Sequence, residues 1–143
     1  MQCPGGTTGS YAIPNTVTKI LYSAFNGCAR LTNIAIPNSV TGIGDNAFGG
    51  CTGLASVTIP DSVIHLGNGA FAGCSSLTNA TIGCNIAASA FAYCQSLTDV
   101  TIGQSVTTIG DSAFWRCTSL MGIDGQLGVV WVILCAFWGS AAN

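Results

Sequence analysis

The residues best suited to chemistry in this sequence are its eight cysteines. Five of them recur at one position of a sequence repeat, and we call this position the cysteine register. Each of these five lies three residues after the phenylalanine of an Ala-Phe pair; they are Cys28, Cys51, Cys74, Cys94 and Cys117. Equivalent residues on stacked coils would lie about 4.8 Å apart, and Cα atoms stacked in parallel do not present the geometry that disulfides favour. We therefore expect five reduced thiols that pack in the core as small apolar groups.

The remaining cysteines, Cys3, Cys84 and Cys135, fall outside this register and are expected to be exposed. A zinc site would need a C-x₂-C or Cys/His pair, and the sequence has neither. We accordingly predict no metal ion and no cofactor.

The other titratable residues do not form a catalytic set. The single histidine, His65, could pair with a cysteine, but no Asp or Asn falls where it would orient the ring, so His65 is interpreted as a solvated surface residue. Asp45 and Asp111 occupy one repeat position and are interpreted as turn or cap residues. Paired carboxylates would also need a cleft, which a flat sheet does not offer. We predict that the chain is not an enzyme.

These residues are positioned by an internal repeat. The Ala-Phe pair returns at spacings of 23, 23, 20 and 23 residues. Each pair is followed by Cys, Leu and two alternating apolar residues, a period and form typical of leucine-rich repeats. In the segment 54–59, alternation directs Val57 and Ile59 inward and leaves Ser56 and Thr58 outside. We predict a right-handed repeat solenoid of about five coils, with short parallel β-strands and short helical or 3₁₀ turns that bury the Phe residues.

A second strand and one irregular coil are also predicted. The segment 39–43 is β-branched and could form a strand opposite the first. The coil that leads to Phe91 is three residues short: Ile86 keeps the position of Ile43, but the position of Val40 has no occupant. We expect the solenoid to be tighter or kinked there.

Residues 36–54 read Ile-Pro-Asn-Ser-Val-Thr-Gly-Ile-Gly-Asp-Asn-Ala-Phe-Gly-Gly-Cys-Thr-Gly-Leu. This wording resembles the BspA-type leucine-rich repeat, and the resemblance covers about residues 10–121. Members of that family are mostly bacterial or protist surface proteins, so the resemblance implies adhesion or protein binding at a cell surface, without catalytic residues. The first residues have no basic and apolar regions of a signal peptide. The expected organisation is a lead-in (1–9), the solenoid (10–121) and a degenerate apolar last repeat or cap (122–143).

Composition narrows the partners to a protein or a glycan. Three Lys and Arg residues are too few for a nucleic-acid surface or for an anionic membrane. The outward strand positions form a candidate binding face: Asn33, Ala35, Ser56, Thr58, Asn79, Thr81, Asp99 and Thr101, continued by Gly122 and Asp124. This face has no aromatic residue and no arginine, so it either suits weak, multivalent contact or simply solvates the sheet.

The segment 129–138 is apolar throughout, and its ten residues are too few to span a bilayer. Three interpretations stay open: it folds back as a last coil, it inserts into a membrane, or it forms an assembly surface, for which the candidate residues are Val129, Trp131, Ile133 and Trp138. The sequence therefore predicts a non-catalytic interaction or adhesion module. The alternative is a structural building block that forms homo-oligomers through uncapped solenoid ends.

Overall fold

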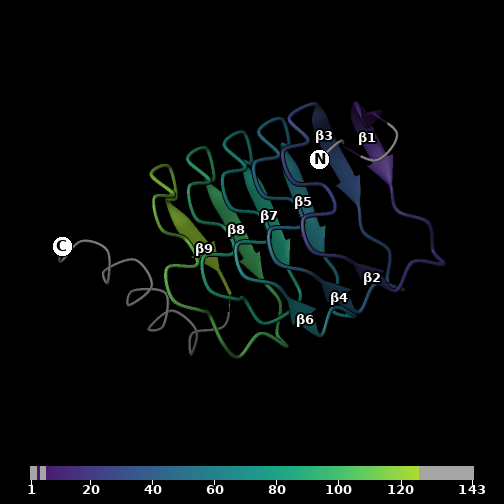
Figure 1. The fold of residues 1–143 in the computed structure, drawn as a ribbon. Helices are drawn as coiled ribbons and strands as arrows, with labels where there is room; N and C mark the ends of the chain where they lie inside the picture. Colours follow the sequence, from purple (N-terminus) through teal and green to yellow (C-terminus); the bar gives the residue numbers. More distant parts are fainter. Residues whose placement is uncertain (1–2, 4–5, 126–143) are drawn as a thin grey trace.

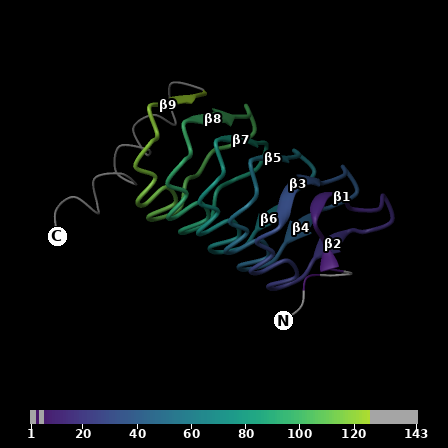
Figure 2. The ribbon, with the colours of Figure 1, turned by 90° about the horizontal axis from the view of Figure 1, so that it is seen from above.

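The computed structural model describes residue 3 and residues 6–125. Coils of the chain stack in sequence order along one axis, as both views show (Figures 1 and 2). A six-stranded parallel sheet contains β1 (Gly9–Ala12), β3 (Leu31–Ala35), β5 (Ser56–Ile59), β7 (Asn79–Ile82), β8 (Asp99–Ile102) and β9 (Gly122–Asp124). A three-stranded parallel sheet contains β2 (Lys19–Ile20), β4 (Gly42–Ile43) and β6 (His65–Leu66). The predicted solenoid of short parallel strands is confirmed.

The core between the two sheets is built from the repeated apolar positions. The five Phe rings form one continuous stack, with neighbouring centroids 4.9 to 5.6 Å apart and nearly parallel planes. Phe48, Phe71 and Phe91 have no exposed surface, as predicted. In β5 the burial alternates, with Val57 and Ile59 inside, because successive strand residues point to opposite faces. One repeated sequence thus produces one uninterrupted core.

The Ala-Phe segments form turns with the hydrogen-bond spacing of a 3₁₀-helix. In one coil, Ala47 N donates to Gly44 O at 3.2 Å and Cys51 N donates to Phe48 O at 3.2 Å. Asp45 lies in the turn, as predicted, but its side chain does not cap the turn of its own coil. Its Oδ1 accepts from the backbone N–H of Asn68 in the next coil, at 2.8 Å. The N–H groups at the start of its own turn are already bonded to carbonyls, so the side chain links two coils instead.

Each of these turns ends, just before its cysteine, at a residue with positive φ. Gly27, Gly50 and Gly73 hold this position in the first three coils, with φ between 68° and 74°. Glycine suits the position because it has no Cβ to clash in the left-handed region. Tyr93 and Arg116 hold the same position in the last two coils, with φ of 62° and 59°.

The short coil affects the two sheets differently. β7 pairs with both β5 and β8 over four residues in register, so the long sheet continues through it. The short sheet ends at β6, and only an isolated bridge between Ile86 and Ile109 follows. Cys84, predicted to be exposed, is 5% exposed and joins the core. It is the one side chain between Ile82 and Ile86 available to fill the space of the missing apolar residue.

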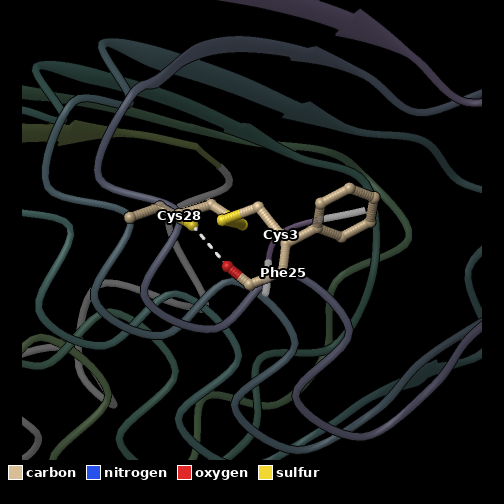
Figure 3. The surroundings of a disulfide bond; sticks show 4 residues. Cys3, Phe25 and Cys28 are labelled. Atoms are coloured by element: carbon tan, nitrogen blue, oxygen red, sulfur yellow. Dashed lines mark hydrogen bonds between the residues drawn. A yellow bond between two sulfur atoms is a disulfide. The ribbon is translucent and has the colours of Figure 1, made fainter. Parts of the chain in front are cut away.

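The first cysteine of the register is not a free thiol. Cys28 forms a disulfide with Cys3, which comes from the lead-in segment (Figure 3). The predictions that Cys28 is reduced and that Cys3 is exposed and free are therefore wrong. Stacked residues of the register cannot pair with one another, but a residue outside it can approach Cys28 from the end of the column, where the Cα atoms lie 5.5 Å apart.

Candidate functional site

The other four cysteines of the register form a buried column of thiols. Each Sγ donates to the carbonyl oxygen of the Phe in the preceding coil, at 3.1 to 3.2 Å. The donors are Cys51, Cys74, Cys94 and Cys117. Hydrogen bonds between neighbouring thiols raise the pKa of Cys74 and Cys117, to which burial adds, and lower the pKa of Cys51 and Cys94. Because all four thiols are buried and each donates to a carbonyl, this column suits packing in the core.

Cys84 is also unsuited to act as a nucleophile. Burial, and secondarily the negative charge of Asp61, raise the pKa of its thiol to about 11. His65, the candidate partner for a thiol, lies exposed on β6 and on the outside of the short sheet. The described part of the chain therefore brings no thiol and imidazole together as a catalytic pair.

The outward positions of the long sheet lie in two straight rows. One row pairs Asn33, Ser56, Asn79, Asp99 and Gly122 from strand to strand, and the other pairs Thr58, Thr81, Thr101 and Asp124. All eight residues of the candidate binding face, Ala35 included, are exposed. In-register parallel pairing places equivalent side chains about 4.8 Å apart, so the rows form a continuous polar surface.

Side chains on this face are ordered by bonds between coils. Thr78 Oγ1 donates to Ala55 O at 3.1 Å, and Thr98 Oγ1 lies 3.2 Å from Thr78 O and 2.7 Å from Asp99 Oδ2. The Asn79 side-chain amide is oriented with its nitrogen towards Thr78 O and Asp99 Oδ2. In this orientation it donates to Thr78 O at 2.9 Å and to Asp99 Oδ2 at 3.3 Å. The Asp99 carboxylate is thus held at a defined position between β7 and β8.

Three residues outside the candidate face form an aromatic and cationic cluster on the turns that lead into β8 and β9. The rings of Tyr93 and Trp115 meet edge to face, with centroids 4.7 Å apart. The Arg116 guanidinium lies over the Trp115 ring at 5.1 Å from its centroid. Tyr93 N also donates to Trp115 O at 2.7 Å, which fixes the two turns together. We call these three residues the turn cluster.

Sequence reasoning missed the turn cluster because it considered only strand positions. A signal was present, however: Tyr93 and Arg116 replace the glycine of the three preceding coils. A bulky residue at positive φ costs on the order of 1 kcal/mol or more, and such strain gathers at functional positions. Trp, Tyr and Arg are also the residues enriched at the centres of protein interfaces.

The sequence-family model described as BspA type leucine rich repeat region matches residues 7–121 of this chain, in six copies. The chain belongs to the BspA-type leucine-rich-repeat family. Among curated proteins, no sequence matches it.

Solved structures of bacterial leucine-rich-repeat proteins share the BspA-type fold of this chain. One from Eubacterium ventriosum is 26% identical over 87% of this chain and 35% of its own, with a TM-score of 0.81. A leucine rich cell surface protein from Faecalibacterium prausnitzii is 26% identical over 83% of this chain and 41% of its own (TM-score 0.56). One from Bacteroides ovatus is 26% identical over 83% and 43% (TM-score 0.55). This BspA-type chain thus spans less than half the length of these three proteins.

The candidate assembly residues Val129, Trp131, Ile133 and Trp138 lie outside the described residues, as does Cys135. In the part of this BspA-type chain that the structure does describe, no helix has the length and hydropathy needed to cross a bilayer. Within residues 3 and 6–125, no three His, Cys, Asp or Glu side chains gather as ligands for a metal ion. The long-sheet face and the turn cluster are thus the candidate functional surfaces of the described residues.

Proposed function

We propose that this chain is a non-catalytic protein-interaction module of a surface protein, and that it binds through the outer face of the long sheet together with the turn cluster. The observation that carries the proposal is their adjacency along the chain. The turns that carry Tyr93 and Trp115 precede β8 and β9 in the same coils, and outward side chains of these strands belong to the polar rows. A polar surface next to an aromatic and arginine anchor is the composition of a protein interface.

Two further observations support a surface role in adhesion. Disulfides form and persist mainly in oxidising compartments, which include the cell surface. The Cys3–Cys28 disulfide is therefore consistent with a surface protein. The Faecalibacterium prausnitzii protein with the same fold is described as a cell surface protein. The polar rows offer repeated hydroxyl and amide groups, so a glycan attached to the partner protein is included among the proposed ligands.

Binding to immobilised panels of purified extracellular-matrix proteins and of glycans tests this proposal. We expect saturable binding of at least one protein, reduced at least tenfold in the variant Trp115→Ala, because a central interface anchor contributes 2 kcal/mol or more. The double variant Thr58→Arg, Thr81→Arg should reduce the same binding by placing bulk on the rows. The matched control is the double variant Gln104→Arg, Thr107→Arg, which adds the same two charges at exposed positions outside both surfaces.

Two outcomes would contradict the proposal. One is that no panel member binds. The other is that binding is unaffected by all changes to the face and the turn cluster. In either case the rows would serve only to solvate the sheet.

The alternative, assembly through the solenoid ends, is supported by one specific feature. β1 and β2 are edge strands of their sheets, and beside them is a hollow of about 240 Å³. Its lining includes Tyr11, Ile13 and Val17, which are largely apolar side chains at the first described coil. Edge strands beside apolar surface favour pairing with a second chain.

Sedimentation velocity over a concentration series distinguishes the two candidates. A monomer at every concentration would favour the binding module. Higher-order species that dissociate in the variant Val17→Lys, which places a charge in the hollow, would favour assembly. The contribution of Val129, Trp131, Ile133 and Trp138 to such assembly stays a prediction.

A further inference from the structure

The short sheet presents a notch between two basic side chains on its outer face. Register places Lys19, Gly42 and His65 side by side on β2, β4 and β6. Lys19 and His65 are exposed, and their Cα atoms are about 10 Å apart because adjacent strands are spaced by about 4.8 Å. Between them Gly42 has no side chain. A Cβ built at Gly42 would meet Lys19 Cγ at 3.8 Å, which is ordinary van der Waals contact.

Apolar side chains surround this notch. Leu21, Tyr22 and Ile64 are 71%, 67% and 76% exposed, and they are three of the five large hydrophobic residues most exposed in the described part of the chain. Together with the notch they line a hollow of about 550 Å³. Apolar groups gathered on a surface in this way, instead of scattered singly, mark interaction sites.

The polarity of the hollow indicates the chemistry of its occupant. None of its ten lining residues is acidic, although the chain as a whole has a net charge of −2. Lys19 can therefore pair with a carboxylate without competition from within the hollow. The hydroxyl of Thr41 is already committed, since its Oγ1 donates to Thr18 O at 3.2 Å. The lining has no Asn, Gln, Asp or Glu to bond the many hydroxyl groups of a sugar.

We propose that this hollow, which we call the short-sheet groove, binds an acidic peptide segment of a partner protein. The carboxylate of an Asp or Glu would lie over Gly42, between Lys19 and His65. Apolar residues on either side of that acid would contact Leu21, Tyr22 and Ile64. This surface belongs to β2, β4 and β6, which lie apart from the long sheet (Figure 1), so it is separate from the face proposed above.

Fluorescence anisotropy with short labelled peptides tests the proposal on the full chain. The probe has a central Leu-Glu-Phe sequence in a Gly/Ser host, and its twin has Gln in place of Glu. We expect the Glu peptide to bind about fivefold more tightly, the upper range for one exposed charge pair. The variants Lys19→Gln and Gly42→Thr should each remove this preference, the first by removing the charge and the second by filling the notch. Arg30→Gln removes an exposed cation elsewhere and should keep it.

Neither of the two substitutions is expected to unfold the protein. Gly42→Thr fits the backbone because Gly42 has no positive φ and because Thr108 stands at the equivalent repeat position. Lys19→Gln changes only an exposed side chain. Three results would overturn the proposal: equal affinity for the Glu and Gln peptides, a preference that survives both variants, or an oligosaccharide of uronic acids that binds in the short-sheet groove more tightly than the peptide.

Discussion

The two sheets are made by the same coils, yet they differ in how they respond to the three-residue deletion. In the long sheet, β7 of the short coil pairs in register with both neighbours. In the short sheet, pairing stops at β6 and resumes only as the Ile86–Ile109 bridge. Around the short coil, four residues pair β7 with β5 and four pair β7 with β8, whereas two residues hold each pair of the short sheet; β3 and β5 pair only at Asn33 and Ser56.

The difference indicates that the two sheets have different structural roles. The strands β3, β5, β7 and β8 of the long sheet each follow or begin at a buried Leu that comes three residues after a buried Cys, which anchors these strands to the core. The short sheet has two paired residues per strand pair and is interrupted at the short coil. Its outer face also carries the exposed apolar side chains Leu21, Tyr22 and Ile64. Strand pairing in the long sheet is continuous through the short coil, whereas strand pairing in the short sheet changes with the length of the coil.

A substitution in the shared core should destabilise both sheets more than any other change. Phe71 stacks between Phe48 and Phe91 at 4.9 and 5.4 Å, and it supports both sheets. Phe71→Ala should cost about 3 to 5 kcal/mol in the free energy of unfolding, since it leaves a cavity that the stack cannot close. Urea unfolding measures this cost, and hydrogen exchange should show β6 and β7 losing protection together. Wild-type melting of this variant would mean that the stack does not carry the core.

The first coil of the solenoid should respond to reduction, whereas the middle coils should not. The Cys3–Cys28 bond closes a loop with a sequence separation of 25 residues. Cys3→Ser should lower the free energy of unfolding by about 3 kcal/mol, because the unfolded chain regains the entropy of that loop. Urea titrations with and without reductant provide the control: reductant should destabilise the wild type but leave Cys3→Ser unchanged. Equal stability of all four samples would contradict this account.

Restoring the missing residues should make the two sheets alike. Insertion of Gln-Ser-Val after Gly83, together with Cys84→Thr, gives the short coil the length and pattern of residues 102–109. The new Val should take the place of Cys84 at the missing apolar position and add about 1 to 2 kcal/mol of stability. Hydrogen exchange should detect new protection near Ile86 as the short sheet becomes continuous. Unchanged protection there would show that the deletion is not what ends this sheet.

The smallest expected effect concerns pH. Burial raises the pKa of Cys84 to about 11, above the ordinary value of 9.0, so the folded state retains the thiol proton longer than the unfolded state does. The resulting stability is complete below pH 9 and is lost as the pH rises towards 11. Urea midpoints of wild type and Cys84→Ala, compared at pH 7 and pH 10.5, measure this. The difference between the two proteins should change in favour of the variant at high pH, and a constant difference would refute the account.

The sequence was sufficient to predict the parts of the fold that repeat. Recurrence of Phe, Cys, Leu and the Val57–Ile59 alternation dictates which side chains are buried, and stacking then dictates parallel strands. The eight candidate face residues are exposed because alternation alone determines the side of a strand on which a residue lies. Repetition thus converts a local pattern into a three-dimensional arrangement.

Features that occur once could not be predicted in this way. The Cys3–Cys28 bond depends on the path of a lead-in segment that follows no repeat. The burial of Cys84 depends on how the short coil closes. The contact between Tyr93 and Trp115 depends on turn geometry that brings successive coils together. Each of these needs the coordinates of neighbouring coils and not only the sequence of one.

The column of buried thiols provides the protein with a built-in spectroscopic reporter. Each S–H group of Cys51, Cys74, Cys94 and Cys117 donates to a carbonyl of the preceding coil, so its vibration reports the contact between two particular coils. S–H stretching lies in a spectral window that other protein groups leave almost empty. Replacing one of these cysteines at a time by alanine would assign the bands. Unlabelled protein could then reveal the order in which neighbouring coils separate during unfolding.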